Sequence, residues 1–156
     1  INARVPISLW YCLILFSAVE LDDKTINIMK NLIIDAASKK IVLTLITNID
    51  IYICTHKNSK SNFEKLIVLI NNFLDNNKTS INDIDIIYVN RGPGSFAGIR
   101  NSLSIVKGLF LTKKIDYYCF SFKDFGNFKE FKYKDIPNLC NKFKVKKNLI
   151  KPLYLS

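Results

Sequence analysis

One segment of the sequence carries residue types and spacings suited to chemistry, and it runs from Asn90 to Arg100. It reads Asn-Arg-Gly-Pro-Gly-Ser-Phe-Ala-Gly-Ile-Arg. Its glycines let the backbone turn tightly and let another group approach it closely. Where such a loop joins a strand to a helix, unpaired backbone N–H groups and the helix dipole can hold an anion. Anion binding is therefore the first chemistry that the segment suggests.

Two of the three arginines in the chain, Arg91 and Arg100, belong to this segment, whereas the twenty lysines all lie outside it. A guanidinium is a planar donor that can bind a phosphate or a carboxylate through two hydrogen bonds. Two interpretations are open. The arginines either meet a ligand, or they hold the loop by bonding carbonyl groups or Asp35.

Known phosphate-binding patterns fit the segment poorly. The Walker pattern is absent, because no glycine stands at the required spacing before a Gly-Lys pair. Gly92, Gly94 and Ala97 formally match the dinucleotide fingerprint. The acid that should end the next strand is missing, since Asp116 precedes that strand and Asp124 follows it.

A purely structural interpretation competes with anion binding. In it the segment is a tight strand-to-helix turn, and Gly98 and Gly108 let the following helix pack closely. Asp35, at the end of an apolar stretch, poses the same choice between a phosphate- or metal-facing acid and a turn former. The residues by themselves leave both alternatives open.

The elements that position the segment follow from the spacing of apolar residues. Runs of apolar and β-branched residues, or their strict alternation with polar ones, predict strands at residues 32–34, 41–47, 49–54, 84–89 and 117–122. The alternating run is the third, which we expect to be a half-buried strand.

Two helices are expected between these strands. A capping box at Ser61 and Glu64 begins the first, and Ser95 is the expected N-cap of the second. The order is therefore βββαβαβ, which predicts an α/β fold with a mixed sheet and flanking helices. The apolar stripes of the two helices are Phe63, Leu66, Ile67, Ile70, Phe73 and Leu74, and Ile99, Leu103, Val106 and Phe110.

The chain after residue 122 has a weak pattern and a strong charge. Phe125, Phe128 and Phe131 recur among lysines and predict a helix or a loop that covers the sheet. Twelve lysines and four acidic residues lie between Lys107 and Ser156. Such a basic surface attracts polyanions such as RNA, or it is a solvated face that reflects lysine-rich codon usage.

Cysteine and histidine usage argues against a metal or redox site. Cys12, Cys54, Cys119 and Cys140 form no C-x-x-C pair, and His56 is the one histidine. Zinc binding, a dithiol redox pair and a Ser-His-Asp triad are therefore not supported. We expect reduced, mostly buried thiols in a cytoplasmic protein, without a cofactor or a metal.

The first part of the sequence differs from the rest. Residues 5–19 are apolar but shorter than a membrane-spanning helix, and the one methionine is Met29. We expect residues 1–28 to be an extension outside the fold, with a membrane-surface anchor as the alternative.

Residues 91–100 also resemble the R-G-P-G-S-F-T-G-[LVI]-R signature of the bacterial TsaB family, also called YeaZ. Collinear flanking segments are similar to those of the family as well. They are residues 29–38, 62–66, 80–86, 107–109 and 151–155. The similarity covers residues 29–122 and then the last few residues.

This resemblance implies an actin/Hsp70-like, ribonuclease H-like lobe. It implies a non-catalytic subunit that helps to install threonylcarbamoyl on the adenosine next to the tRNA anticodon. In the family this subunit pairs with a catalytic paralogue, TsaD, through helices of the N-terminal lobe, and an ATPase, TsaE, joins the complex. A homodimer is a further expectation, and tRNA is reached through the complex. We discount the glycoprotease-like activity sometimes attached to the family, because no nucleophile–base pair is visible.

The resemblance also selects candidate site residues. The motif residues are Arg91, Gly92, Pro93, Gly94, Ser95, Phe96, Gly98 and Arg100, with Asp35 as a vestigial phosphate-side acid. The candidate partner-facing residues are Phe63, Leu66, Ile70, Ile99, Leu103 and Val106.

The sequence departs from the family pattern in places. Ala97 stands where the family has threonine, Asn62 where it has histidine, and Ala36 follows Asp35 in place of threonine. We expect residues 29–122 to form the N-terminal lobe and residues 123–156 a shortened basic segment in place of a second lobe. Because a nucleotide cleft needs two lobes, we expect no tight nucleotide binding. Rival functions are a small anion- or nucleotide-binding enzyme and a general RNA-binding protein.

Overall fold

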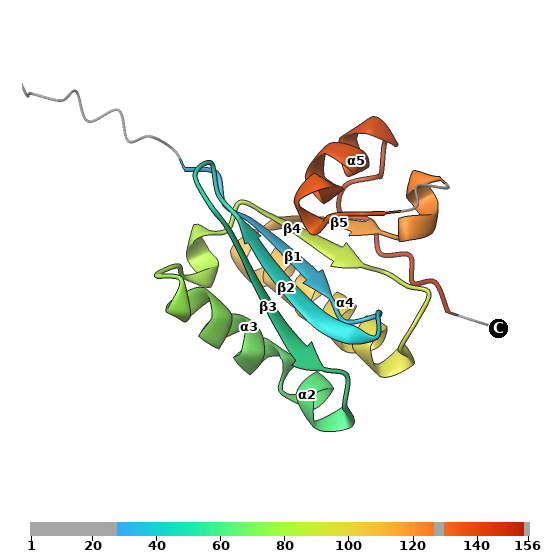
Figure 1. Cartoon of the computed structure of the whole chain (residues 1–156), viewed down its shortest axis with the longest axis horizontal. Helices are drawn as coiled ribbons and strands as arrows, with labels where there is room; N and C mark the ends of the chain where they lie inside the picture. The colour runs from blue at the N-terminus through green and yellow to red at the C-terminus, as the bar shows by residue number, and fades with distance from the viewer. Residues whose placement is uncertain (1–27, 127–129, 155–156) are drawn as a thin grey trace, which may run out of the picture.

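A computed structural model of the chain describes residues 28–126 and 130–154 (Figure 1). The predicted N-terminal extension lies outside the described residues, apart from Ile28, and so do Cys12 and Phe128. In the part of the chain that the structure describes, no helix has the length and apolar character needed to cross a membrane.

The centre of the fold is one five-stranded sheet. Its strands are β1 (Asn31–Asp35), β2 (Lys40–Ile46), β3 (Ile51–Lys57), β4 (Ile86–Asn90) and β5 (Asp116–Phe120). They lie side by side in the order β3-β2-β1-β4-β5. The first three form an antiparallel meander, and β4 and β5 continue from β1 as parallel strands. The predicted mixed sheet and the order of its elements are confirmed.

The α-helices are α2 (Lys60–Glu64), α3 (Leu66–Asn76), α4 (Phe96–Lys113) and α5 (Ile136–Lys142). The first two lie between β3 and β4, α4 connects the parallel strands β4 and β5 as such a pair requires, and α5 follows β5. Short 3-10 helices are η1 (Ile81–Asp83), η2 (Phe122–Phe125) and η3 (Tyr133–Asp135).

The helical region after β3 begins differently from the prediction. The Ser59 hydroxyl accepts a hydrogen bond from the Asn62 N–H (3.3 Å), so Ser59 is the N-cap. Ser61 already lies inside the first turn, and the predicted capping box with Glu64 is wrong. Lys65 has non-helical dihedrals and divides the region into α2 and α3.

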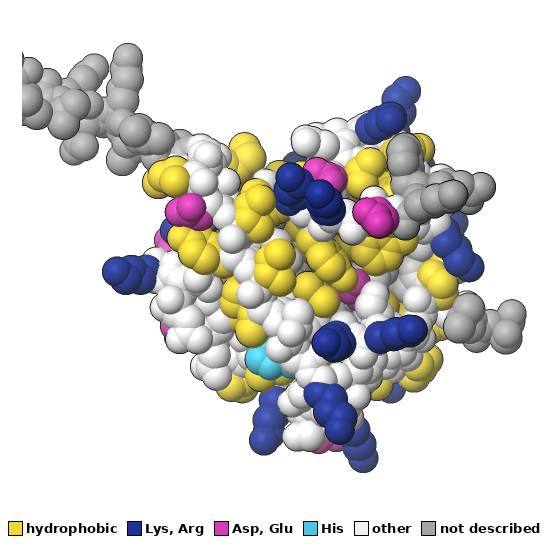
Figure 2. Space-filling model, viewed as in Figure 1, with side chains coloured by type: hydrophobic (Ala, Val, Ile, Leu, Met, Phe, Trp, Pro, Cys, Tyr) yellow, Lys and Arg dark blue, Asp and Glu magenta, His cyan; other side chains and the backbone are white. Residues whose placement is uncertain are grey.

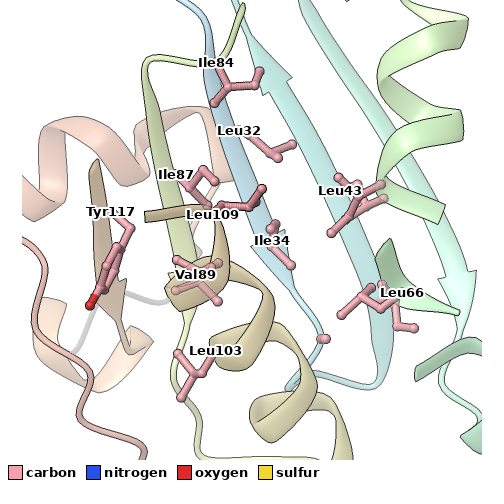
Figure 3. Close-up of a cluster of buried hydrophobic side chains, with 14 of the residues drawn as sticks. Leu32, Ile34, Leu43, Leu66, Ile84, Ile87, Val89, Leu103, Leu109 and Tyr117 are labelled. Atoms are coloured by element: carbon pink, nitrogen blue, oxygen red, sulfur yellow. The ribbon is translucent and has the colours of Figure 1, made fainter. Parts of the chain in front are cut away.

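One face of the sheet packs against α3 and α4 (Figure 3). Alternate side chains of the strands, such as Leu32 and Ile34 of β1, point to this face and are fully buried. Leu66 from α3 and Leu103 from α4 meet them. Burial of each such side chain stabilises the fold by about 1.5–3 kcal/mol. This cluster is the main core of the domain.

The other face of the sheet is covered by residues that follow β5 in the sequence. Ile33 of β1 and Tyr88 of β4 point to this side, where Phe125, Ile136 and Cys140 pack on them. The predicted cover of the sheet by the phenylalanine-rich segment is thus confirmed for Phe125, which is fully buried, and for Phe131, which packs against it (ring centroids 5.9 Å apart).

The β3 edge of this second face remains open. Ile51 is 44 % exposed and Ile53 is 59 % exposed, while Cys54 points to the opposite face and contacts the main core. Figure 2 shows apolar side chains gathered in the middle of this side of the molecule. The alternation of residues 49–54 correctly predicts a strand. Its isoleucines, however, are exposed and do not form the buried side of that strand.

The opposite edge of the sheet is covered. Lys147 forms an isolated antiparallel bridge to Tyr118 of β5. The Asn148 amide oxygen accepts a hydrogen bond from the Tyr117 N–H (2.9 Å), and its NH₂ group donates to Asp116 (2.7 Å). The segment after α5 therefore closes the β5 edge, which an open sheet would leave unpaired.

Candidate functional site

The glycine-rich segment connects the end of β4 to the start of α4. Ser95 is the N-cap of α4, since its hydroxyl accepts a hydrogen bond from the Gly98 N–H (3.3 Å), as predicted. Gly92 has a φ of 107°, a conformation that residues with a side chain rarely adopt. The Gly92 N–H donates to the Asn90 side-chain oxygen (2.9 Å). The turn is therefore stabilised by hydrogen bonds from its own backbone to the side chains of Asn90 and Ser95, and it depends on the backbone conformation of Gly92.

The segment packs directly on the turn that follows β1. The Ser95 N–H donates to the Ala37 carbonyl (2.9 Å). A Cβ atom at Gly94 would overlap the Ala37 carbonyl, and one at Gly98 would overlap the Ala36 carbonyl. Gly94 and Gly98 are thus required by the close approach of two backbones.

Gly108 does not share this role. A Cβ at Gly108 would have no neighbour within 4 Å, whereas one at Gly98 would also meet the Phe63 ring. The prediction that both glycines permit close packing is correct for Gly98 and wrong for Gly108. Gly108 lies on an exposed part of α4.

Arg91 is used inside the chain. Its guanidinium forms an ion pair with Asp124 (Nη2–Oδ1, 2.6 Å; Nε–Oδ2, 3.3 Å) and donates to the Lys151 carbonyl (3.2 Å). The Arg91 N–H donates to the Phe120 carbonyl, and its own carbonyl accepts from Leu153 (both 2.8 Å). Arg91 therefore ties β4, β5 and the C-terminal segment together.

Asp35 is a fully buried turn former. Its carboxylate accepts hydrogen bonds from the N–H groups of Ala37 and Ser38 (both 3.1 Å) and from the Ser38 hydroxyl (2.7 Å). The Tyr133 hydroxyl adds a fourth, at 2.8 Å. Burial, followed by the nearby Asp35 carboxylate, raises the pKa of Tyr133 above its ordinary value. Of the internal partners expected for Arg91, the structure shows a carbonyl group, that of Lys151, and not Asp35.

The remaining motif side chains face outward. Phe96 is 60 % exposed, and its ring lies 4.9 Å from that of Tyr154. Arg100, Lys107 and Pro152 line a shallow groove between α4 and the C-terminal segment. Arg91 and Arg100 thus have different surroundings, one inside an ion pair and one at the surface.

The six helical side chains expected to meet a partner are buried in the main core. Their exposed fractions are 5 % or less, so this residue-level prediction is wrong. The exposed apolar side chains of the same region are Ile67 (37 %) and Val68 (50 %) on α3. The buried six are Phe63, Leu66, Ile70, Ile99, Leu103 and Val106.

Within the described ranges, no group of three or more histidine, cysteine or acidic side chains could hold a metal ion. Cys119 and Cys140 are buried free thiols, and Cys54 is partly buried. Burial raises the pKa of Cys119 and of Cys140 to about 12, so both stay protonated and unreactive at neutral pH.

Sequence reasoning missed the distant residues that complete the site. Tyr133 carries no local signal, because it is one polar residue in a lysine-rich stretch. Asp124 follows Ser121 by three residues, and this capping-box spacing, which the structure forms, could have marked it as a turn residue. The closing segment at residues 151–155 was indicated by family resemblance alone. Leu153 and Lys151 in that segment bond Arg91 through their backbone groups.

The sequence is similar to proteins of tRNA threonylcarbamoyladenosine biosynthesis. The family model for TsaD, a tRNA N6-adenosine threonylcarbamoyltransferase, matches residues 54–121. Two curated relatives from Buchnera aphidicola are both named tRNA threonylcarbamoyladenosine biosynthesis protein TsaB. The one from subspecies Baizongia pistaciae is 38 % identical over 65 residues, and the one from Schizaphis graminum is 30 % identical over 89 residues.

The chain is similar to TsaB (YeaZ) proteins over part of its length. The matches cover 36 % and 50 % of this chain but only 29 % and 42 % of the two relatives. The chain therefore matches less than half the length of the curated TsaB proteins.

The solved structures agree on the fold. YeaZ from Pseudomonas aeruginosa superposes with a TM-score of 0.55 at 20 % identity, over 60 % of this chain and 44 % of that protein. A second Pseudomonas aeruginosa structure, described as similar to peptidase YEAZ, gives the same TM-score and identity over 43 % of its length. The expected fold class is confirmed, because the chain shares the α/β fold of these YeaZ structures.

Proposed function

We propose that this chain acts in tRNA threonylcarbamoyladenosine biosynthesis as a non-catalytic subunit that binds a TsaD-like catalytic protein. The names of its two curated TsaB relatives support the pathway. A TsaE-like ATPase, assembly of two copies and a cytoplasmic location belong to the same proposal. They come from the family resemblance.

The state of the signature loop supports a structural role for it. In a phosphate-binding loop, N–H groups and an arginine face a ligand. Here the N–H groups of Arg91, Gly92 and Ser95 all donate within the chain, and the Arg91 guanidinium is paired with Asp124. The loop braces three strands and a C-terminal segment, which suits a scaffold.

The observation that carries the proposal is a hollow surface where α2 and the start of α3 face α4. A shallow depression of about 330 Å³ lies there, and Ile67 and Ser104 are exposed at it. Val68 continues the apolar surface along α3. Exposed apolar side chains around a depression are typical of protein interfaces. The depression is lined by Phe63, Glu64, Ile67, Asn101, Ser104 and Ile105.

A pull-down with the TsaD-like protein of the same organism tests this surface. The variant Ile67→Glu with Ser104→Glu places two carboxylates in the depression, and we expect it to lose capture at least tenfold. The matched control, Ile53→Glu with Thr55→Glu, changes the same number of exposed residues on the far side of the sheet. Equal capture by both variants, or no capture by the wild-type chain, contradicts the proposal.

Complementation tests the pathway itself. A strain that lacks its own TsaB-like subunit receives a gene that starts at Met29, and the modified nucleoside in bulk tRNA is measured by mass spectrometry. We expect the modification to return with the wild-type sequence and not with the double glutamate variant. Absence of modification with the full-length chain as well counts against a role in this pathway.

The alternative enzyme function depends on nucleotide binding by residues 92–98. Because the loop packs on Ala36 and Ala37, we expect no shift in melting temperature on addition of ATP with magnesium. A clear stabilisation that is lost in Arg100→Gln favours the alternative.

A further inference from the structure

A basic pocket lies where the C-terminal segment passes the ion pair of Arg91 and Asp124. It has a volume of about 280 Å³. Figure 1 shows the chain after α5 returning past β5 toward the end of the described sequence. The lining residues are Arg91, Cys119, Asp124, Phe143, Lys144, Val145, Lys146, Leu149 and Lys151.

The charges around this pocket are unbalanced. Asp124 is the one carboxylate among the lining residues, and it is already paired with Arg91. The ammonium groups of Lys144, Lys146 and Lys151 have no carboxylate within ion-pair distance among the described residues. Three uncompensated cations around one hollow attract an anion of matching size.

The backbone that carries these lysines is held in place. The Val145 N–H donates to the Cys140 carbonyl (2.9 Å), and the Asn148 N–H donates to the Tyr117 carbonyl (2.8 Å). After the lysines, the Leu153 N–H is bonded to the Arg91 carbonyl. Binding at this place therefore orders lysine side chains, and not the chain that bears them, which lowers the entropic cost of capture.

The pocket is not purely ionic. Apolar side chains of Phe143 and Leu149 form part of its wall and are 38 % and 47 % exposed. A ligand that joins a phosphate to a flat, partly apolar ring can use both surfaces, because bases stack on apolar and aromatic side chains while lysines neutralise phosphates. A nucleotide unit combines these two properties, whereas inorganic phosphate or an acidic peptide supplies only charge.

We propose that this pocket, between α5, β5 and residues 144–151, binds RNA directly by taking one nucleotide unit with its flanking phosphates. Lys144, Lys146 and Lys151 neutralise the backbone phosphates. The ion pair of Arg91 and Asp124 lines the pocket. This inference goes beyond the proposed function, because it needs no partner protein and leaves the depression where α2 and the start of α3 face α4 untouched.

Binding of the full chain to a fluorescein-labelled single-stranded RNA tests the inference, measured by anisotropy over a series of salt concentrations. Each lysine–phosphate contact adds about 0.7 to the slope of log affinity against log salt. We therefore expect the triple variant Lys144→Gln, Lys146→Gln, Lys151→Gln to lower the slope by about 2. At about 0.1 M salt its affinity should fall by at least tenfold.

The matched control removes three other exposed lysines, as Lys39→Gln, Lys65→Gln, Lys78→Gln. We expect this control to keep most of the wild-type slope. An equal loss in both variants shows that net charge alone attracts RNA, and it overturns the assignment of a site. A wild-type chain that does not bind RNA at low salt overturns it as well.

Further arms of the experiment separate the sources of the anion. AMP carries a base but lacks the flanking phosphates, so it should compete with the RNA much more weakly than unlabelled RNA does at the same nucleotide concentration, and polyglutamate of equal charge should also compete poorly. Competition by AMP equal to that of unlabelled RNA assigns the pocket to free nucleotides, and equal competition by polyglutamate assigns it to acidic proteins. Either result overturns the proposal. Arginine at the same three positions should restore binding, which excludes misfolding as the cause of the loss.

The outcome is separable from that of the scaffold proposal. The triple lysine variant should still capture the TsaD-like protein, and the variant with Ile67→Glu and Ser104→Glu should still bind RNA. Each proposal can therefore fail without the other.

Discussion

The two faces of the sheet are closed by different kinds of chain. The first face is covered by α3 and α4, whose apolar residues recur at helical spacing. The second is covered by short helices, 3-10 turns and loops drawn from residues 121–145. The cover of the first face can thus be predicted from the local pattern within each helix. The cover of the second face depends on contacts between residues far apart in the sequence.

The signature loop, residues 91–100, contacts the residues that cover both faces of the sheet. On one side Gly98 seats α4 against Ala36 and Phe63, as part of the helical face. On the other side Arg91 binds Asp124 and Lys151, as part of the second face. A glycine-rich motif can therefore act by joining the two halves of a core, without a ligand.

The largest expected effect concerns the glycine contact on the helical face. Gly98→Ala pushes a methyl group into the Ala36 carbonyl and should destabilise the fold by about 3 kcal/mol. Gly108→Ala, in the same helix but in open space, should stabilise it by about 0.5–1 kcal/mol, because alanine favours the helix. Urea denaturation of the two variants measures the contrast. A similar stability for both would mean that α4 is not seated as described.

The next effect concerns the ion pair on the second face. Asp124→Ala removes the partner of Arg91 and also the acceptor of the Ser121 N–H (2.8 Å). We expect a loss of about 2 kcal/mol in the free energy of unfolding. Asp124→Asn should lose less, since its side-chain oxygen can still accept from Ser121. If neither substitution changes urea stability, the second face does not depend on this link.

A smaller effect is expected where η3 reaches the turn after β1. Tyr133→Phe removes the hydrogen bond to the buried Asp35 and should cost about 1.5 kcal/mol. Tyr118→Phe on the same face is the control, and it should cost little. The comparison is made by thermal denaturation. A larger effect at Tyr118 would place the important contacts of this face along β5 and away from Asp35.

The smallest effect concerns the covered edge of β5. Hydrogen bonds from Lys147 and Asn148 hold the pKa of Asp116 below its ordinary value of 3.8. A carboxyl with a lowered folded-state pKa stabilises the fold above its ordinary pKa, and this stabilisation is lost as the pH falls through the lowered value. Both groups are partly exposed, so the contribution is screened.

The measurement is the melting temperature as a function of acid pH. Asp116→Asn should have a slightly lower melting temperature than the wild type at neutral pH, and the two should converge as the pH falls below 3.8. A constant difference over the whole range would show that the link is not electrostatic.

Local sequence signals predicted the local features well. Ser95 was expected as an N-cap because a hydroxyl before an apolar stripe is a local pattern, and the structure agrees. The five strands, and their order along the chain, could be predicted because apolar runs are also local patterns. The structural interpretation of Gly98 was also available from the sequence, although the same glycine permitted a phosphate loop.

The failures concern properties that depend on what packs against an element. The alternation around Ile53 reveals a strand but not which face is covered, because that depends on residues beyond 121. The bond between Asp35 and Tyr133 spans 98 positions, and no spacing rule reaches so far. A helical stripe such as Leu66 and Ile70 can face a core or a partner, and the deep core of this fold takes them.

The backbone hydrogen bond between Leu153 and Arg91 has a consequence for the order of assembly on the ribosome. Synthesis proceeds from the N-terminus, so β1 to β4 and the signature loop are made well before residues 151–154. Until then the Arg91 carbonyl and guanidinium lack two of their final partners. The signature loop, although central in the sequence, is completed by some of the last described residues to be translated.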